Sequence, residues 1–81
     1  MIVRVVLYGM LREKLAKESR GRLTVELPEG SRLADLRAHL GINGPVGSSI
    51  NGQIERNPER VLQDGDEVHI FQSIGGGGQL P

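Results

Sequence analysis

The stretch that decides the fold runs from Leu23 to Gly41 and reads LTVELPEGSRLADLRAHLG. Its opening residues, Leu23 to Leu27, alternate apolar and polar side chains, which is the pattern of a half-buried strand. The Pro-Glu-Gly step at 28–30 breaks that strand, because proline and glycine favour turns. The sequence therefore predicts a strand that ends at Leu27 and is followed by a turn and a different element.

That next element is predicted to be the main helix. Three leucines recur at spacings of three and four and form one apolar stripe: Leu33, Leu36 and Leu40. Ser31 is a good N-cap and Asp35 favours the positive end of a helix, while Gly41 is a natural residue to end it. A helix with one apolar stripe needs one surface to cover, and a sheet provides it.

Strand patterns on both sides of the helix supply that sheet. Ile2 to Tyr8 and Glu67 to Ser73 are predicted as the first and last strands, apolar enough to lie side by side in its centre. In the last strand Val68 and Ile70 face one way, and His69 and Phe71 face the other. The first strand and the strand at 23–27 are predicted to pair antiparallel.

Shorter signals fill the rest of the chain. Asn51-Gly52 between two short strands predicts a hairpin, because both turn residues need positive φ. Leu11 to Leu15 suits a helical turn, residues 42–47 read as mostly loop, and Val61 and Leu62 are expected under the core. The element order predicts an α+β fold, with one main helix packed across a mixed sheet of four to five strands.

Length and composition limit the possible functions. The chain has 81 residues, equal numbers of basic and acidic residues, two aromatic residues and no cysteine. These features favour one domain with no nucleic-acid groove, no disulfide and no cysteine-based metal site. No apolar run approaches membrane-spanning length. We expect a soluble, cytoplasmic protein without a membrane partner.

The chemistry-bearing residues form no convincing catalytic or metal-binding constellation. His39 and His69, the two histidines, have no carboxylate or second histidine at metal-ligand spacing. The Asp-Gly-Asp-Glu run at 64–67 lacks the further ligands of a calcium loop and is predicted to be a turn. The glycines at 75–78 lack the lysine and the following helix of a phosphate loop. We expect no enzyme activity, bound cofactor or metal in this chain.

Several motifs together resemble the ThiS/MoaD family of ubiquitin-like sulfur carriers. They are LQDGDEV at 62–68, IFQSI at 70–74 followed by a glycine pair, YGMLRE at 8–13, LPEGS at 27–31 leading into LADL at 33–36, and ING at 50–52. The step at 8–13 is closer to the MoaD version. The resemblance covers nearly the whole chain and implies a β-grasp, ubiquitin-like domain over residues 1–74. Residues 75–81 then form a flexible glycine-rich tail.

The resemblance implies a role in sulfur transfer. In this family a ubiquitin-activating-type adenylyltransferase uses ATP to activate the C-terminal glycine, which becomes a thiocarboxylate. The thiocarboxylate then donates sulfur to an accepting synthase in cofactor or metabolite biosynthesis, as for molybdopterin or thiamine. Among the tail glycines Gly75, Gly76, Gly77 and Gly78, the family alignment favours Gly77 as the reacting residue, with Gly78 as second choice.

This chain departs from the family pattern after the glycine pair. Gly78, Gln79, Leu80 and Pro81 form an extension that would block adenylation unless a protease removes it. Relatives with such extensions are trimmed by JAMM-type metalloproteases, so the resemblance implies an enzyme of this type as a partner. The alternative function is a prokaryotic ubiquitin-like modifier, which is conjugated to lysines through the same glycine. A third interpretation is a β-grasp binding module whose tail is inert.

A partner-binding surface is predicted beside the tail. If the first and last strands are neighbours, the alternation places Val6 and Tyr8 near His69 and Phe71 on an exposed face, with Ile74 continuing from it. Exposed apolar clusters on small proteins often mark binding sites. We therefore expect Val6, Tyr8, His69, Phe71 and Ile74 to contact the activating enzyme.

Overall fold

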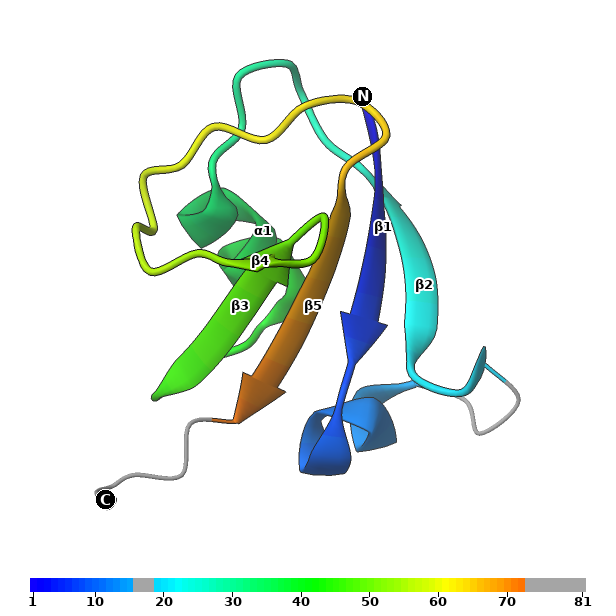
Figure 1. The fold of residues 1–81 in the computed structure, drawn as a ribbon. Helices are drawn as coiled ribbons and strands as arrows, with labels where there is room; N and C mark the ends of the chain where they lie inside the picture. The colour runs from blue at the N-terminus through cyan, green and yellow to red at the C-terminus, as the bar shows by residue number, and fades with distance from the viewer. Residues whose placement is uncertain (16–18, 73–81) are drawn as a thin grey trace.

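A mixed sheet with one helix packed against a face forms the framework of the protein (Figure 1). The computed structural model describes residues 1–15 and 19–72. Within them the sheet has the order β2-β1-β5-β3-β4 and consists of β1 (Ile2–Leu7), β2 (Arg22–Glu26), β3 (Val46–Ile50), β4 (Gln53–Ile54) and β5 (Glu67–Gln72). The helical elements are the 3-10 helix η1 (Gly9–Lys14) and the α-helix α1 (Leu33–Leu40). The predicted α+β fold is confirmed.

The first and last strands lie side by side in the centre of the sheet, as predicted. β1 runs antiparallel to β2, with Val3 opposite Val25, and parallel to β5, with Val5 beside Val68. A parallel pair needs a long crossover, and α1 lies within the crossover that joins these two strands. This topology brings the ends of β1 and β5 to the same edge of the molecule (Figure 1).

The hydrophobic core fills the space between α1 and one face of the sheet. Its fully buried side chains alternate along the two central strands and meet the leucine stripe of the helix: Val3, Val5, Leu7, Val68, Ile70, Leu33 and Leu36. Fully burying such a side chain stabilises the fold by about 1.5–3 kcal/mol. The opposite face of the sheet, which α1 does not cover, is called the outer face.

The N-cap of helix α1 is Arg32, one residue later than the predicted Ser31. The Ser31 hydroxyl donates a hydrogen bond to the Pro28 carbonyl at 2.8 Å, so it closes the preceding turn and does not cap the helix. The carboxylate of Asp35 accepts the Arg32 N–H at 2.7 Å and occupies the positive end of the helix, as expected. Gly41 ends the helix with φ of 70°, which confirms its predicted role.

The Asn51-Gly52 hairpin is confirmed, with φ values of 51° and 88° at the two turn residues. Its first strand starts earlier than expected, because residues 46 and 47 were predicted as loop and instead belong to β3. Val46 pairs with Gln72 and Gly47 pairs with Phe71. Pairing with β5 therefore overrides the low strand preference of the glycine.

Other boundaries agree with the sequence within one or two residues. Leu62 is buried as predicted, whereas Val61 is 41% exposed, so its expected place under the core is wrong. Val61 forms an isolated bridge with Arg32 at the surface, and the next residue, Leu62, packs in the core. The predicted domain boundary at residue 74 and the tail lie outside the described residues. No helix in the described part of the chain is long and apolar enough to cross a membrane.

Candidate functional site

Three of the predicted partner-binding residues come together at the end of β5 on the outer face. The Tyr8 hydroxyl lies 2.7 Å from Nδ1 of His69, and the two ring centroids are 5.5 Å apart. Phe71 follows on the same face of β5, since side chains two residues apart in a strand point the same way. Ile74, the fifth predicted member, lies outside the described residues.

Val6 also lies on this face, but it is only 7% exposed and the prediction that it is exposed is wrong. The reason is the central place of β1. Val6 is paired with Arg22 of β2 on one side and with His69 of β5 on the other. Val6 is therefore flanked by a strand on each side and is buried, and Tyr8 and Phe71 are the more exposed members of the predicted surface.

The ring of Phe71 packs against β3 at Gly47, where the absence of a side chain leaves room for it. A Cβ atom added to Gly47 would lie 2.3 Å from Cε1 and 2.8 Å from Cζ of the Phe71 ring. The aromatic ring therefore lies flat over a position where any larger residue would displace it. Aromatic side chains commonly cover glycines on neighbouring strands in this way.

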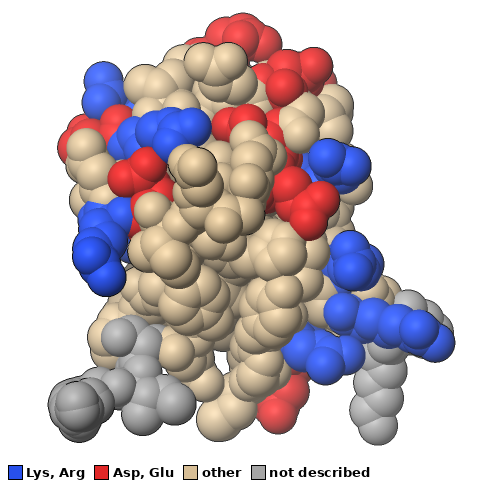
Figure 2. Space-filling view, viewed as in Figure 1, with Lys and Arg blue, Asp and Glu red and all other residues tan. Residues whose placement is uncertain are grey.

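Val6, Tyr8, Gly47 and Phe71 together form what we call the apolar patch. Figure 2 shows the outer face with its lower central part free of charge, while lysine and arginine lie at the margins and most carboxylates lie above. The patch adjoins Gln72, the last described residue of β5. The predicted tail glycines and the extension, residues 75–81, lie outside the described residues.

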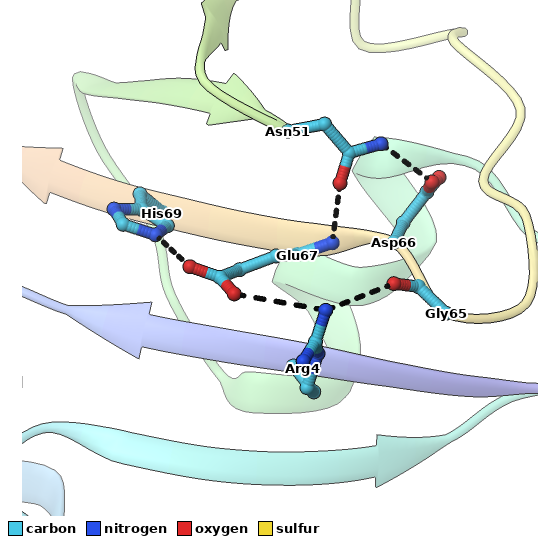
Figure 3. A network of polar contacts seen from close by, with 6 residues as sticks. All are labelled: Arg4, Asn51, Gly65, Asp66, Glu67 and His69. Carbon is cyan, nitrogen blue, oxygen red and sulfur yellow. Dashed lines mark hydrogen bonds and ion pairs between the residues drawn. The ribbon is translucent and has the colours of Figure 1, made fainter.

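A polar network occupies the other half of the outer face, at the start of β5 (Figure 3). Nε2 of His69 lies 2.7 Å from the Glu67 carboxylate, whose other oxygen is 3.8 Å from an Arg4 guanidinium nitrogen. Because a carboxylate only accepts, Nε2–H must donate to Glu67, and in the neutral ring Nδ1 then accepts from the Tyr8 hydroxyl. The network thereby fixes the Tyr8 side chain through its hydroxyl group.

Electrostatics and backbone contacts hold this network in place. The hydrogen bond from His69 lowers the pKa of Glu67 below its usual value of 4.5, and Arg4 and Arg22 contribute to the same shift. Asn51 donates to the buried Asp66 carboxylate at 2.9 Å and accepts the Glu67 N–H at 2.9 Å. The hairpin turn is therefore tied to the start of β5.

The polar groups beside the apolar patch position one of its aromatic side chains. Within residues 1–15 and 19–72, no group of three or more histidine, cysteine, aspartate or glutamate side chains could hold a metal ion. The relay from Tyr8 through His69 to Glu67 ends in groups that already satisfy one another, so it positions an aromatic side chain. Sequence reasoning placed His69 on this face but missed Arg4, Glu67 and Gly47 as its companions.

Solved structures of other proteins share this fold. A structure from Pyrococcus furiosus described as molybdopterin converting factor, subunit 1, has a TM-score of 0.75 and 23% identity over 91% of this chain and 99% of that one. Small archaeal modifier protein 1 of Haloferax volcanii has a TM-score of 0.73 and 13% identity over 90% and 98%. A chain of the complex of subunits 1 and 2 of the Helicobacter pylori molybdopterin-converting factor has a TM-score of 0.65 and 23% identity over 95% and 100%.

At these identities the likeness establishes a β-grasp, ubiquitin-like fold. No curated protein is similar enough in sequence to match the chain. The model of the ThiS family, by contrast, matches residues 5–77, which is most of the chain and includes every described strand in whole or in part. The chain therefore belongs to the ThiS family, and its fold is that of a ubiquitin-like β-grasp domain.

Proposed function

We propose that this protein is a sulfur carrier whose glycine Gly77 is adenylated and converted to a thiocarboxylate. The observation that carries the proposal is the extent of the family match, which ends at Gly77. That residue is the second glycine of the pair that the sequence motifs align with the reacting end of the family. In this role the chain is a substrate of its partner enzymes and needs no catalytic side chain of its own.

The chemistry of the tail supports the proposal. Adenylation requires a free carboxylate to attack the α-phosphate of ATP and release pyrophosphate. A sulfur donor then attacks the acyl carbon of the adenylate and AMP leaves. Glycine has no Cβ, so a glycine-rich end can enter a narrow channel in an extended form. The five residues that follow Gln72, up to and including Gly77, can span at most about 18 Å. That reach would let the folded domain stay at the mouth of a partner's nucleotide site.

Residues 78–81 must be removed before this chemistry can occur. While Gly78 follows, the Gly77 carbonyl is part of a peptide bond and has no free carboxylate to activate. We propose that a metalloprotease of the JAMM type removes Gly78, Gln79, Leu80 and Pro81. The full-length chain would then be an inactive precursor, and Gly78 would be the next-best end point for cleavage.

The apolar patch is proposed as the surface that contacts the activating adenylyltransferase and then the sulfur-accepting synthase. It lies where β5 ends, so a partner bound there would receive the tail directly. Tyr8 is 43% exposed and is held by His69, which reduces the conformational freedom lost on binding. Exposed aromatic side chains of this kind often dominate binding energy.

Intact-protein mass spectrometry tests the proposal. Full-length, Gly77-ended and Gly78-ended chains would be incubated with ATP, an activating enzyme verified on another carrier, and a sulfur donor. We expect one oxygen to be replaced by sulfur in the Gly77-ended chain, weakly or not at all in the Gly78-ended chain, and not in the full-length chain. The Gly77→Ala variant of the Gly77-ended chain should react poorly. Equal reaction of the full-length chain would refute the precursor step.

Conjugation to lysine uses the same activated glycine and needs its own assay. Small archaeal modifier protein 1 shares the fold, which motivates the comparison. An immunoblot of the native host would show a ladder of larger conjugates if the protein is a modifier. Thiocarboxylate formation without such a ladder supports the carrier. Absence of any reaction with a competent enzyme would favour a binding module with an inert tail.

A further inference from the structure

A groove of about 380 Å³ lies at the free edge of β3, next to the apolar patch, and is also lined by Gly47 and Phe71 of that patch. Its walls come from α1, β3, β4, the segment that follows β4, and the end of β5, and they include Arg37, Val46, Ser48, Ile54, Arg56 and Phe71. Glu55 also lines it. The groove is thus built from elements that are far apart in sequence, and it has the size of a site for a short ligand.

The edge of β3 is only partly covered by β4. β4 pairs with Ser49 and Ile50, and the Glu55 N–H then donates to the Ser48 carbonyl at 2.8 Å. Among residues 1–15 and 19–72, no strand pairs with Val46 or Gly47 on the side away from β5. An uncovered strand edge is a ready template for another extended chain.

Two arginines give the groove an unbalanced positive charge. Arg37 donates from Nη2 to the Ser48 hydroxyl at 3.0 Å, while its buried Nε–H has no acceptor in the described part of the chain. Arg56 is exposed and makes no ion pair with any described residue. A guanidinium with unused donors is suited to a carboxylate.

The one carboxylate of the groove does not offset this charge. Glu55 accepts from Arg60 at 2.9 Å and from the Asn57 N–H at 3.1 Å, and these contacts lower its pKa. Its charge is therefore matched by Arg60, which leaves Arg37 and Arg56 without a carboxylate partner among the described residues. The groove also has apolar walls, because Ile54 is 61% exposed and Phe71 borders it from the patch side.

We propose that this groove binds an extended peptide of a partner protein in which apolar residues are followed by carboxylates. The peptide backbone would add to the free edge of β3, an apolar side chain would cover Ile54, and carboxylates would meet Arg37 and Arg56. Residues 73–81 of the chain itself carry no acidic side chain, so the tail offers the two arginines at most one carboxylate, at its end, and charge complementarity favours a partner. The inference goes beyond sulfur carriage and does not depend on the chemistry of Gly77.

Three capped peptides that differ in their last two residues, TVIVDD, TVIVNN and TVIVKK, test the proposal. They would be titrated into the full-length ¹⁵N-labelled protein and followed by NMR. We expect the amide signals of residues 46–48 and 54–56 to move, and TVIVDD to bind at least tenfold more tightly than TVIVNN. TVIVKK should show no saturable binding. Equal affinities, or shifts confined to Tyr8 and His69, would overturn the proposal.

Matched charge reversals locate the binding site. Arg56→Glu should weaken TVIVDD binding at least tenfold. Arg22→Glu makes the same charge change on an exposed residue of β2, which β1 and β5 separate from β3, and should change affinity less than twofold. Neither arginine has an ion pair among the described residues, so both variants should stay folded, as signal dispersion would show. Equal losses in the two variants would indicate unspecific attraction and refute the site.

The chain's own tail is the competing occupant. In the full-length protein the double variant Ile74→Ser with Leu80→Ser removes the large apolar side chains of residues 73–81. If the groove signals move in this variant before any peptide is added, the tail fills the groove and the proposal of a partner peptide is wrong. Unchanged groove signals, together with unchanged affinity for TVIVDD, support it.

Discussion

The two halves of the outer face differ in how far their side chains satisfy one another. At the start of β5, Arg4, Asn51, Asp66 and Glu67 form a network in which donors meet acceptors (Figure 3). At the end of β5, the apolar patch presents half-exposed rings above a buried valine. Both halves rest on the same strands and on the same core.

This contrast separates two kinds of work within one small sheet. The polar half joins the hairpin to the last strand, so its contacts contribute to folding stability. The apolar half has little left to gain within the molecule, and its exposed rings gain most when a partner covers them. Substitutions in the first half should therefore act on unfolding, and substitutions in the second on binding.

Removing the shared support should have the largest effect. Leu36 is fully buried between α1 and the sheet, so Leu36→Ala should lower the free energy of unfolding by about 2–5 kcal/mol. Urea denaturation of the variant and the parent measures this loss. A urea midpoint close to that of the parent would mean that the helix packs through another face. The two halves of the outer face would then not share the core described here.

Breaking the polar half should cost less stability and leave binding alone. Asp66→Ala leaves the Asn51 amide and the Gln63 N–H without their buried acceptor, which should cost about 1–3 kcal/mol. Glu26→Ala on exposed β2 is the control and should stay within about 0.5 kcal/mol. If Asp66→Ala instead weakened binding of the activating enzyme at unchanged stability, the two halves would have exchanged roles.

Breaking the apolar half should have the reverse outcome. Phe71→Asp removes the ring that covers Gly47 and places a charge in the patch, yet it leaves the core intact. Stability should fall by about 1 kcal/mol or less, while affinity for the activating enzyme should drop at least tenfold in calorimetry of the Gly77-ended chain. Unfolding of this variant, or unchanged affinity, would remove the basis for separating the halves.

The pH dependence of stability should show the smallest effect. The folded state lowers the pKa of Glu67, so this carboxylate contributes stability above its ordinary value of 4.5 and loses that contribution as the pH falls through the lower folded value. Glu67→Gln should therefore lose less stability than the parent between about pH 6 and about pH 3. Parallel urea titrations at the two pH values measure the difference, with Glu26→Gln as the control. A steeper acid loss in Glu67→Gln would contradict the shift.

The sequence predicted what depends on local pattern and missed what depends on register. Alternation placed Val68 and Ile70 in the core, and the Asn51-Gly52 step correctly predicted a hairpin. Which residue lies under Phe71 depends on how β3 aligns with β5, and no local signal near Gly47 gives that alignment. The burial of Val6 likewise depends on its pairing with two neighbouring strands.

The site was only partly predictable for the same reason. His69 and Phe71 could be assigned to one face from their spacing alone. The link from His69 to Arg4 requires the parallel pairing of β1 with β5 in one particular register, which sequence spacing does not fix. Alternation along the first strand put Arg4 on the same face as Val6 and Tyr8, but it could not place Arg4 in contact with Glu67.

The parallel pairing of β1 with β5 also sets when the molecule becomes competent during its synthesis. Val5 of β1 pairs with Val68 of β5, so the centre of the sheet cannot form until the ribosome has made almost the whole domain. The residues proposed for activation follow directly after this last strand. A nascent or prematurely terminated chain would lack both the closed sheet and the reactive end. The sheet can therefore close before the proposed reactive end is made available.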